Sequence, residues 1–258
     1  DAWLVLVGGF IGLGGAFMAY VFATFHWANM SLFAYLQLLD NSRAVYRAWL
    51  GGSLVVLIGL LVPQTMFWGE EEIQVVAGWR PAQELPNVWP TTGITSFEMN
   101  SALTSFVVGM AKLLSISFTV AGGLRGGYIF PLMMSGTCFG RVIQYLLPDV
   151  IPLQISILCM AAGINVAITR TALASTLILA FLSGEPCAIP AILMASLCSL
   201  FATAYLPFIK TQITRSDIDH SLFHHEGVIG KNNEKFEDDD IQDDDSVDDD
   251  EEKLTTQD

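Results

Sequence analysis

Glycine and proline gather in one short segment whose spacing could build an anion site. Residues 122–131 read Gly-Gly-Leu-Arg-Gly-Gly-Tyr-Ile-Phe-Pro and run into an apolar stretch. Pro131 suits the first turn of a helix, because the N–H that proline lacks would have no partner there. The N–H groups of Tyr128, Ile129 and Phe130 would then point out of a helix N-terminus that carries about half a positive charge. Such an end can bind an anion without a formal cation.

Two other interpretations of this segment exist. The first is a tight loop between two packed helices, with no ligand. The second is a nucleotide-phosphate loop, which the sequence argues against because no Gly-Lys-Ser/Thr follows the glycines and no strand precedes them. Nearby Gly136-x-x-x-Gly140, like Gly8-x-x-x-Gly12, has the spacing at which helices approach closely.

Lone charges and sulfur atoms are the remaining candidates for chemistry. Arg170 lies between two uncharged runs, residues 150–169 and 171–184. It indicates either a charge on a permeation path or, the interpretation we favour, a turn in which the guanidinium reaches water or a helix C-terminus. Lys112 could extend toward the membrane surface. The cysteines lie in apolar segments at irregular spacing, which favours small buried side chains over disulfides; they are Cys138, Cys159, Cys187 and Cys198. We expect no metal and no cofactor.

Charge is scarce in the part of the chain that must position these residues. The first 210 residues hold 8 basic and 9 acidic side chains, whereas about a quarter of a soluble domain is charged. Uncharged runs cover residues 2–39, 48–69 and 186–209, and a membrane-crossing helix needs about 20 apolar residues. Backbone inside lipid must satisfy its own hydrogen bonds, so these runs predict helices. The composition excludes a soluble enzyme and a nucleic-acid-binding protein, which would need a basic patch.

The sequence therefore predicts an all-α, multi-pass integral membrane protein. Several of the expected helices are short and interrupted by glycine or proline, which is typical of the broken and half-spanning helices of transporter bundles. Residues 63–100 are more polar and predict a loop with Trp68, Trp79 and Trp89 as interfacial anchors. The expected helices are 3–24, 31–47, 49–63, 100–120, 130–147, 152–166, 171–183 and 187–206.

The end of the chain has a different composition. Residues 211–258 hold 4 basic and 17 acidic side chains, a net charge of −13. Blocks of like charge repel one another and stay disordered. We expect a membrane domain over residues 1–215 and a disordered acidic cytoplasmic tail over 216–258. Because the chain starts without Met and directly in apolar residues, we also expect it to begin partway through a longer membrane protein.

Two stretches resemble the CLC family of voltage-gated-type chloride channels and chloride/proton exchangers. The first is Gly126–Pro131 followed by Ser135-Gly136-x-x-x-Gly140-Arg141. In that family a Gly-x-Phe-x-Pro stretch opens a helix whose backbone amides hold chloride. The second, at residues 160–179, is similar to the family's Gly-Met-Ala-Ala … Arg-Ala-Pro-Leu-Thr pattern. The resemblance covers residues 3–215 and implies that this chain is the C-terminal part of the family's membrane domain.

The resemblance also implies a chloride site. The amides of Tyr128 and Ile129 would face the ion, and Ile129 stands where the family has Phe, which changes the side chain but keeps the amide donor. Near the end of the domain, Ile209 stands two residues after Pro207, where the family has a pore tyrosine. The implied chloride-binding residues are Gly127, Tyr128, Ile129, Phe130 and Pro131.

The wider architecture follows from the same resemblance. Family members are built from two inverted repeats, and residues 49–206 correspond to the second. They are homodimers with one pore per subunit, and the interface would use segments 3–24 and 171–206. The glutamates that distinguish channel from exchanger belong upstream of residue 1 by family order. A chloride channel is therefore the first interpretation, with a chloride/proton exchanger, a transporter of another anion and a non-transporting membrane scaffold as alternatives.

Overall fold

The structure consists of helices packed on helices. The computed structural model describes residues 2–78, 99–124 and 126–204. This part of the chain contains eight α-helices, three short 3-10 helices and no strand, which confirms the all-α prediction. The elements are α1 (Ala2–Tyr35), η1 (Asn41–Arg43), α2 (Ala44–Leu61), η2 (Pro63–Thr65), α3 (Glu70–Val76), α4 (Ala102–Ala121), α5 (Ile129–Leu146), α6 (Leu153–Thr169), α7 (Ala172–Ser183), η4 (Pro186–Ala188) and α8 (Ile189–Ala202).

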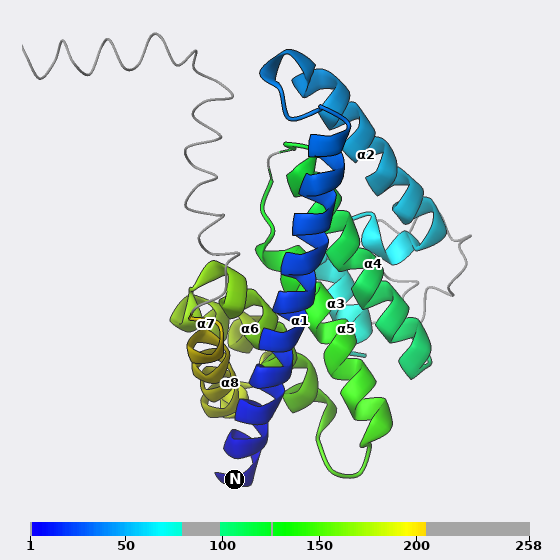
Figure 1. Ribbon diagram of the computed structural model, residues 1–258. Coiled ribbons are helices and arrows are strands. Elements are labelled where there is room, and N and C mark those ends of the chain that lie inside the picture. The colour runs from blue at the N-terminus through cyan, green and yellow to red at the C-terminus, as the bar shows by residue number, and fades with distance from the viewer. Residues whose placement is uncertain (1, 79–98, 125, 205–258) are drawn as a thin grey trace, which may run out of the picture. The chain divides into compact units, whose positions relative to one another are not determined.

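The long helix α1 is the element that the others share. It packs against α8, α6 and α4, while α5 packs between α4 and α6. In Figure 1 the blue helix α1 runs between the α7–α8 pair on one side and the α4–α5 pair on the other. The short helix α3 contacts α5. Helix α5, whose beginning carries the predicted anion site, is therefore held in place by α3, α4 and α6.

The start of the chain differs from the prediction. Separate helices over 3–24 and 31–47 were expected, but α1 runs unbroken for 34 residues and ends near Gln37, which has a φ of 56°. The reason is that no glycine or proline lies between Gly15 and Gly51, so nothing in the expected gap disfavours a helix. The next long helix, α2, then begins at Ala44 instead of residue 49.

A second difference lies in the segment predicted as a loop. Residues 70–76 form α3, which begins with three glutamates. Acidic side chains in a first turn are favoured by the positive end of the helix dipole, so the acidic run stabilises this short helix. Trp68 is exposed, as an interfacial anchor would be. Trp79 and Trp89 lie outside the described residues, and so does the acidic tail.

Glycines set the closest contacts between helices. A Cβ added to Gly12 would overlap the backbone of Ala195 on α8, and one added to Gly15 would lie 2.7 Å from Gly163 on α6. On α5, a Cβ at Gly136 or Gly140 would overlap the backbone of α6. The predicted role of both Gly-x-x-x-Gly pairs in close packing is confirmed, since Gly8 likewise leaves only 2.7 Å to the Ala191 carbonyl.

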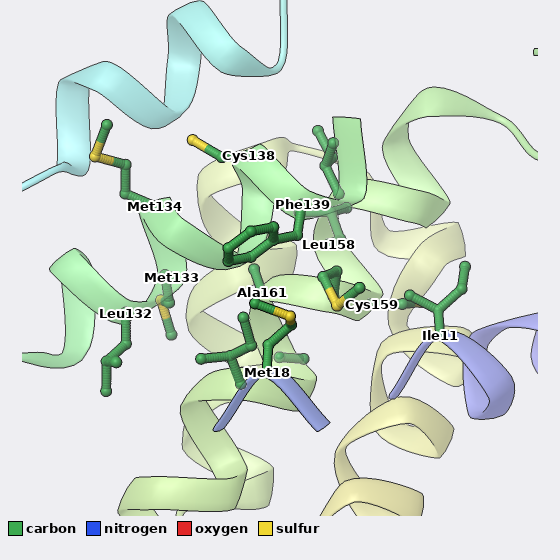
Figure 2. Close-up of a cluster of buried hydrophobic side chains, with 14 of the residues drawn as sticks. Ile11, Met18, Leu132, Met133, Met134, Cys138, Phe139, Leu158, Cys159 and Ala161 are labelled. Carbon is green, nitrogen blue, oxygen red and sulfur yellow. The ribbon is translucent and has the colours of Figure 1, made fainter. Parts of the chain in front are cut away.

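The buried core around α5 and α6 is rich in sulfur. Figure 2 shows Met133, Met134 and Cys138 from α5 in one buried cluster with Cys159 from α6 and Met18 from α1. Cys138 and Cys159 are fully buried free thiols, in agreement with the prediction. The prediction was wrong for Cys187, which is exposed in η4, and Cys198 is only partly buried. Cys187 follows Pro186, where the chain turns between α7 and α8, and such turns lie at the surface.

The outward faces of several helices are apolar. Three helices, α1, α2 and α4, are long and apolar enough to cross a membrane, whereas α6, α7 and residues 186–202 form shorter apolar helices. This combination confirms a membrane bundle with half-spanning helices. Large apolar side chains are exposed on α1, α2 and α7, among them Phe10, Phe17, Trp49, Leu57, Leu173, Leu177 and Phe181. Lipid or further protein would cover such surfaces, and water would not.

The glycine contacts predict opposite effects for two alanine substitutions. Gly12→Ala should lower the free energy of unfolding by roughly 1–3 kcal/mol, because its methyl group collides with α8. Gly52→Ala, on α2, should raise that free energy by about 0.5–1 kcal/mol through helix propensity, since its Cβ would meet only Leu124 Cδ1, at 4.0 Å. Thermal unfolding in detergent micelles, followed by circular dichroism, measures both. Shifts of the same sign would contradict the packing.

Candidate functional site

The candidate anion site lies at the beginning of α5. Tyr128 is the N-cap residue, and its side chain makes no capping hydrogen bond. The first bond of the helix runs from the N–H of Leu132 to the Tyr128 carbonyl, at 3.0 Å. The N–H groups of Ile129 and Phe130 come before that bond, and such first-turn groups have no partner inside their own helix. Pro131 is the third helical residue, so it lies within the first turn as predicted.

The surroundings of this helix end are open. Gly126, Gly127 and Ile129 are exposed, whereas Phe130 is partly buried. A Cβ added to Gly126 or Gly127 would meet no atom of the described residues within 4 Å, and Gly127 does not have a left-handed φ. The described structure therefore does not require glycine at these two positions. It leaves a space beside the helix N-terminus into which an ion or another protein segment could fit.

The preceding glycine pair has a different and purely structural role. The N–H of Gly123 donates to the Val120 carbonyl at 3.0 Å, and the N–H of Leu124 donates to the Thr119 carbonyl at 3.1 Å. This is the Schellman arrangement that ends a helix, with Gly123 in the left-handed region at a φ of 76°. The glycine-rich segment thus has two parts in succession. Gly122 and Gly123 end α4, and Gly126 and Gly127 lead into α5.

The α4 end is also held from the side by α2. A Cβ added to Gly51 would lie 2.8 Å from the Cα atom of Gly122, so the two backbones nearly touch. The guanidinium of Arg47 lies where a side chain on Gly123 would have to go. A cation at this place is favoured by the negative end of the α4 dipole. These contacts fix the point from which the chain leaves α4 for the candidate site.

Arg170 is a helix-terminus residue, as favoured from the sequence. It is the C-cap of α6, with a φ of 63°. One guanidinium nitrogen, Nη1, donates to the Leu200 carbonyl at 2.9 Å and to Thr203 Oγ1 at 3.2 Å. The other, Nη2, donates to the Thr203 carbonyl. Arg170 therefore caps the C-terminal end of α8, which confirms the turn interpretation.

The environment of Lys112 was predicted wrongly from the sequence. Lys112 was expected to extend toward the membrane surface, but the side chain is buried. Its Nζ donates to the Thr65 carbonyl at 3.0 Å and to the Phe67 carbonyl. The expectation failed because these acceptors are more than 40 residues away in sequence. Within the described ranges, no group of three His, Cys, Asp or Glu side chains is placed to hold a metal ion.

Comparison with known proteins gives one family. A family model described as "Voltage gated chloride channel" matches residues 2–204. Curated relatives include the protein named "Putative ion-transport protein YfeO" from Escherichia coli O1:K1 and its namesake from Escherichia fergusonii. Each is 26% identical over 145 residues, which is 56% of this chain and 30% of the relative. The chain thus spans about 30% of the length of the curated relatives it matches. No solved structure matches.

The two glycine pairs predict a contrast in stability. Gly123→Ala should lower the free energy of unfolding by at least about 1–2 kcal/mol, which is the cost of a left-handed conformation for a residue with a Cβ. The loss should be at least this large because the Arg47 side chain also occupies the position of the new methyl group. Gly127→Ala should change it by less than about 0.5 kcal/mol. Thermal unfolding of both variants in the same detergent measures the difference. A Gly127→Ala variant as unstable as Gly123→Ala would contradict this division.

Proposed function

The chain belongs to the voltage-gated chloride channel family, and from that premise we propose that it takes part in chloride transport across a membrane. The ion is held by backbone amides at the N-terminus of α5. The observation that carries the proposal is the open start of α5, where first-turn amides stand beside two glycines that no described neighbour crowds. The proposed chloride-binding residues are Gly127, Tyr128, Ile129, Phe130 and Pro131.

The physical basis is attraction without a formal charge. The unpaired N–H groups of a helix start carry about half a positive charge, and first-turn amides make charge-assisted hydrogen bonds to an anion. Residues 126–140 contain no charged side chain. An ion held only by dipoles binds well enough to enter and weakly enough to leave, which conduction requires. This supports rapid anion passage over permanent binding.

The assembly we propose is a homodimer in a lipid bilayer. Segments 3–24 and 171–206 form its interface. The apolar residues exposed on α1 and α7, such as Phe10 and Phe181, support this assignment because a second subunit would cover them. The family match ends at residue 204, close to the point where the acidic run begins. The end of the match supports a membrane part over residues 1–215. We further propose that residues 49–206 form its second repeat and that residues 216–258 form an acidic cytoplasmic tail.

The anion site predicts a selectivity defect in one glycine variant. In Gly127→Val, the branched side chain enters the space beside the α5 start and displaces chloride from the amides. A hydrogen bond to a charged group is worth roughly 1.5–3 kcal/mol, so chloride permeability relative to nitrate should fall about tenfold or more. Anion flux from liposomes measures the ratio.

The matched control is Gly52→Val, the same change on α2, where a Cβ has only one neighbour, at 4.0 Å. It should leave the permeability ratio unchanged. If the chloride-to-nitrate permeability ratio is unchanged in both variants, the start of α5 does not bind the transported anion. Competition among chloride, nitrate and fluoride in wild type separates chloride transport from transport of another anion, and absence of any anion flux would favour a scaffold.

Channel activity is the form of transport we propose, and it predicts a specific response to pH. The reversal potential of a channel follows the chloride gradient alone, so a pH gradient across the bilayer should leave it unchanged. The reversal potential of a chloride/proton exchanger shifts with the pH gradient, because each cycle also moves protons. Planar-bilayer recordings at fixed chloride and two pH gradients distinguish the two. A reversal potential that shifts with the pH gradient would identify a chloride/proton exchanger instead of a channel. It would leave the proposed anion site unaffected.

A further inference from the structure

A small cavity lies beside α3, away from the start of α5. It has a volume of about 210 Å³ and is lined by Phe67, Trp68, Glu71 and Glu72. Drug-sized ligands occupy about 300–1,000 Å³, so this cavity fits a smaller molecule. Its lining combines two aromatic rings with two carboxylates. The anion site makes no use of any of these residues.

The carboxylate of Glu72 is the unusual group in this lining. Its side chain is only 5% exposed. Its Oε2 atom is buried and accepts no hydrogen bond from any described residue. Burial raises the pKa of Glu72, because a carboxylate removed from water loses the solvation that stabilises its charge. A buried carboxylate in this situation requires either a proton or a nearby cation.

The neighbouring lysine supplies only part of that positive charge. Lys112 acts on Glu72 electrostatically, but its ammonium group donates to the carbonyls of Thr65 and Phe67. These two hydrogen bonds hold in place the segment that contains Phe67 and Trp68. Glu71 is the second carboxylate of the lining. In their ionised forms Glu71, Glu72 and Lys112 together carry a net charge of −1.

The aromatic residues restrict the kind of cation. Trp68 is 65% exposed although it is the largest side chain in the lining. An aromatic face attracts a cation and also offers apolar contact to carbon atoms attached to it. A bare metal ion would prefer several oxygen ligands, and among the described residues no three Asp, Glu, His or Cys side chains are grouped so that they could hold one.

We propose that this cavity binds a small organic ammonium ion, with Glu71 and Glu72 balancing its charge and Phe67 and Trp68 contacting its carbon atoms. The site is independent of the anion site. Methylammonium is the simplest probe of this class. K⁺ carries the same charge without an apolar part and serves as the comparison ligand.

The test is equilibrium binding of radiolabelled methylammonium to the intact purified protein in detergent micelles. Wild type should bind one methylammonium per chain, saturably. Glu72→Gln keeps the shape of the side chain and removes its charge, and it should weaken binding at least tenfold. The control is Glu70→Gln, the same change two residues earlier on α3 at a residue outside the cavity lining, which should change the affinity less than twofold.

A second variant keeps the test valid if Glu72→Gln does not fold. Trp68→Leu removes an exposed ring and should weaken binding about two- to fivefold, as an exposed cation–π contact predicts. K⁺ should compete at least tenfold more weakly than unlabelled methylammonium. The proposal would be overturned by absence of saturable binding, by equal effects of Glu70→Gln and Glu72→Gln, or by equal competition from K⁺. Chloride flux is not part of this readout, so failure here leaves the proposed transport function untouched.

Discussion

The constraint on which this structure depends is that backbone groups at helix ends need partners where water is scarce. The chain meets it in several ways. The end of α4 is closed by the Gly123 Schellman turn, and the end of α8 is closed by the guanidinium of Arg170. The start of α4 is capped by Ser101, whose Oγ accepts from the Thr104 N–H at 3.1 Å. The start of α5 has no such side-chain cap, and the same holds for α2, α3, α6, α7 and α8. In the proposed function, chloride takes at α5 the place that the Ser101 hydroxyl oxygen takes at α4.

Close helix packing holds the shorter helices α6 and α8 against their longer neighbours α1 and α5, and α5 carries this site. Half-spanning helices have few residues with which to hold their position. Glycines on α1 and α5 let the backbones of α6 and α8 approach to contact distance, which maximises dispersion contacts per residue. In lipid this matters more than in water, because burying an apolar side chain between helices gains little over leaving it in the bilayer. The position of the α5 start is thus determined by small residues in its middle.

Much of this could be predicted from the sequence, because the signals are local. Uncharged runs predicted the long helices, and Gly-x-x-x-Gly spacing predicted which faces touch. The segment around Pro131 predicted a helix start, because proline and glycine act on their own backbone. The unbroken course of α1 was not predicted, although the chain between Gly15 and Gly51 contains no helix breaker. The Glu72–Lys112 interaction could not be predicted, because it joins residues 40 positions apart through the packing of α3 on its neighbours.

The packing of α5 has a consequence for the amides at its start. At Gly136 and Gly140 the helix rests directly on the α6 backbone. Nearer the N-terminus, a Cβ on Gly69 would lie only 3.1 Å from the Phe130 carbonyl oxygen and 2.8 Å from Met134 Cβ, so close backbone packing also holds the first two turns. The unbranched side chains of Met133 and Met134 fill the irregular space that remains in the core. The amides at the helix start are therefore held in position before an ion arrives, so binding needs little rearrangement of the backbone.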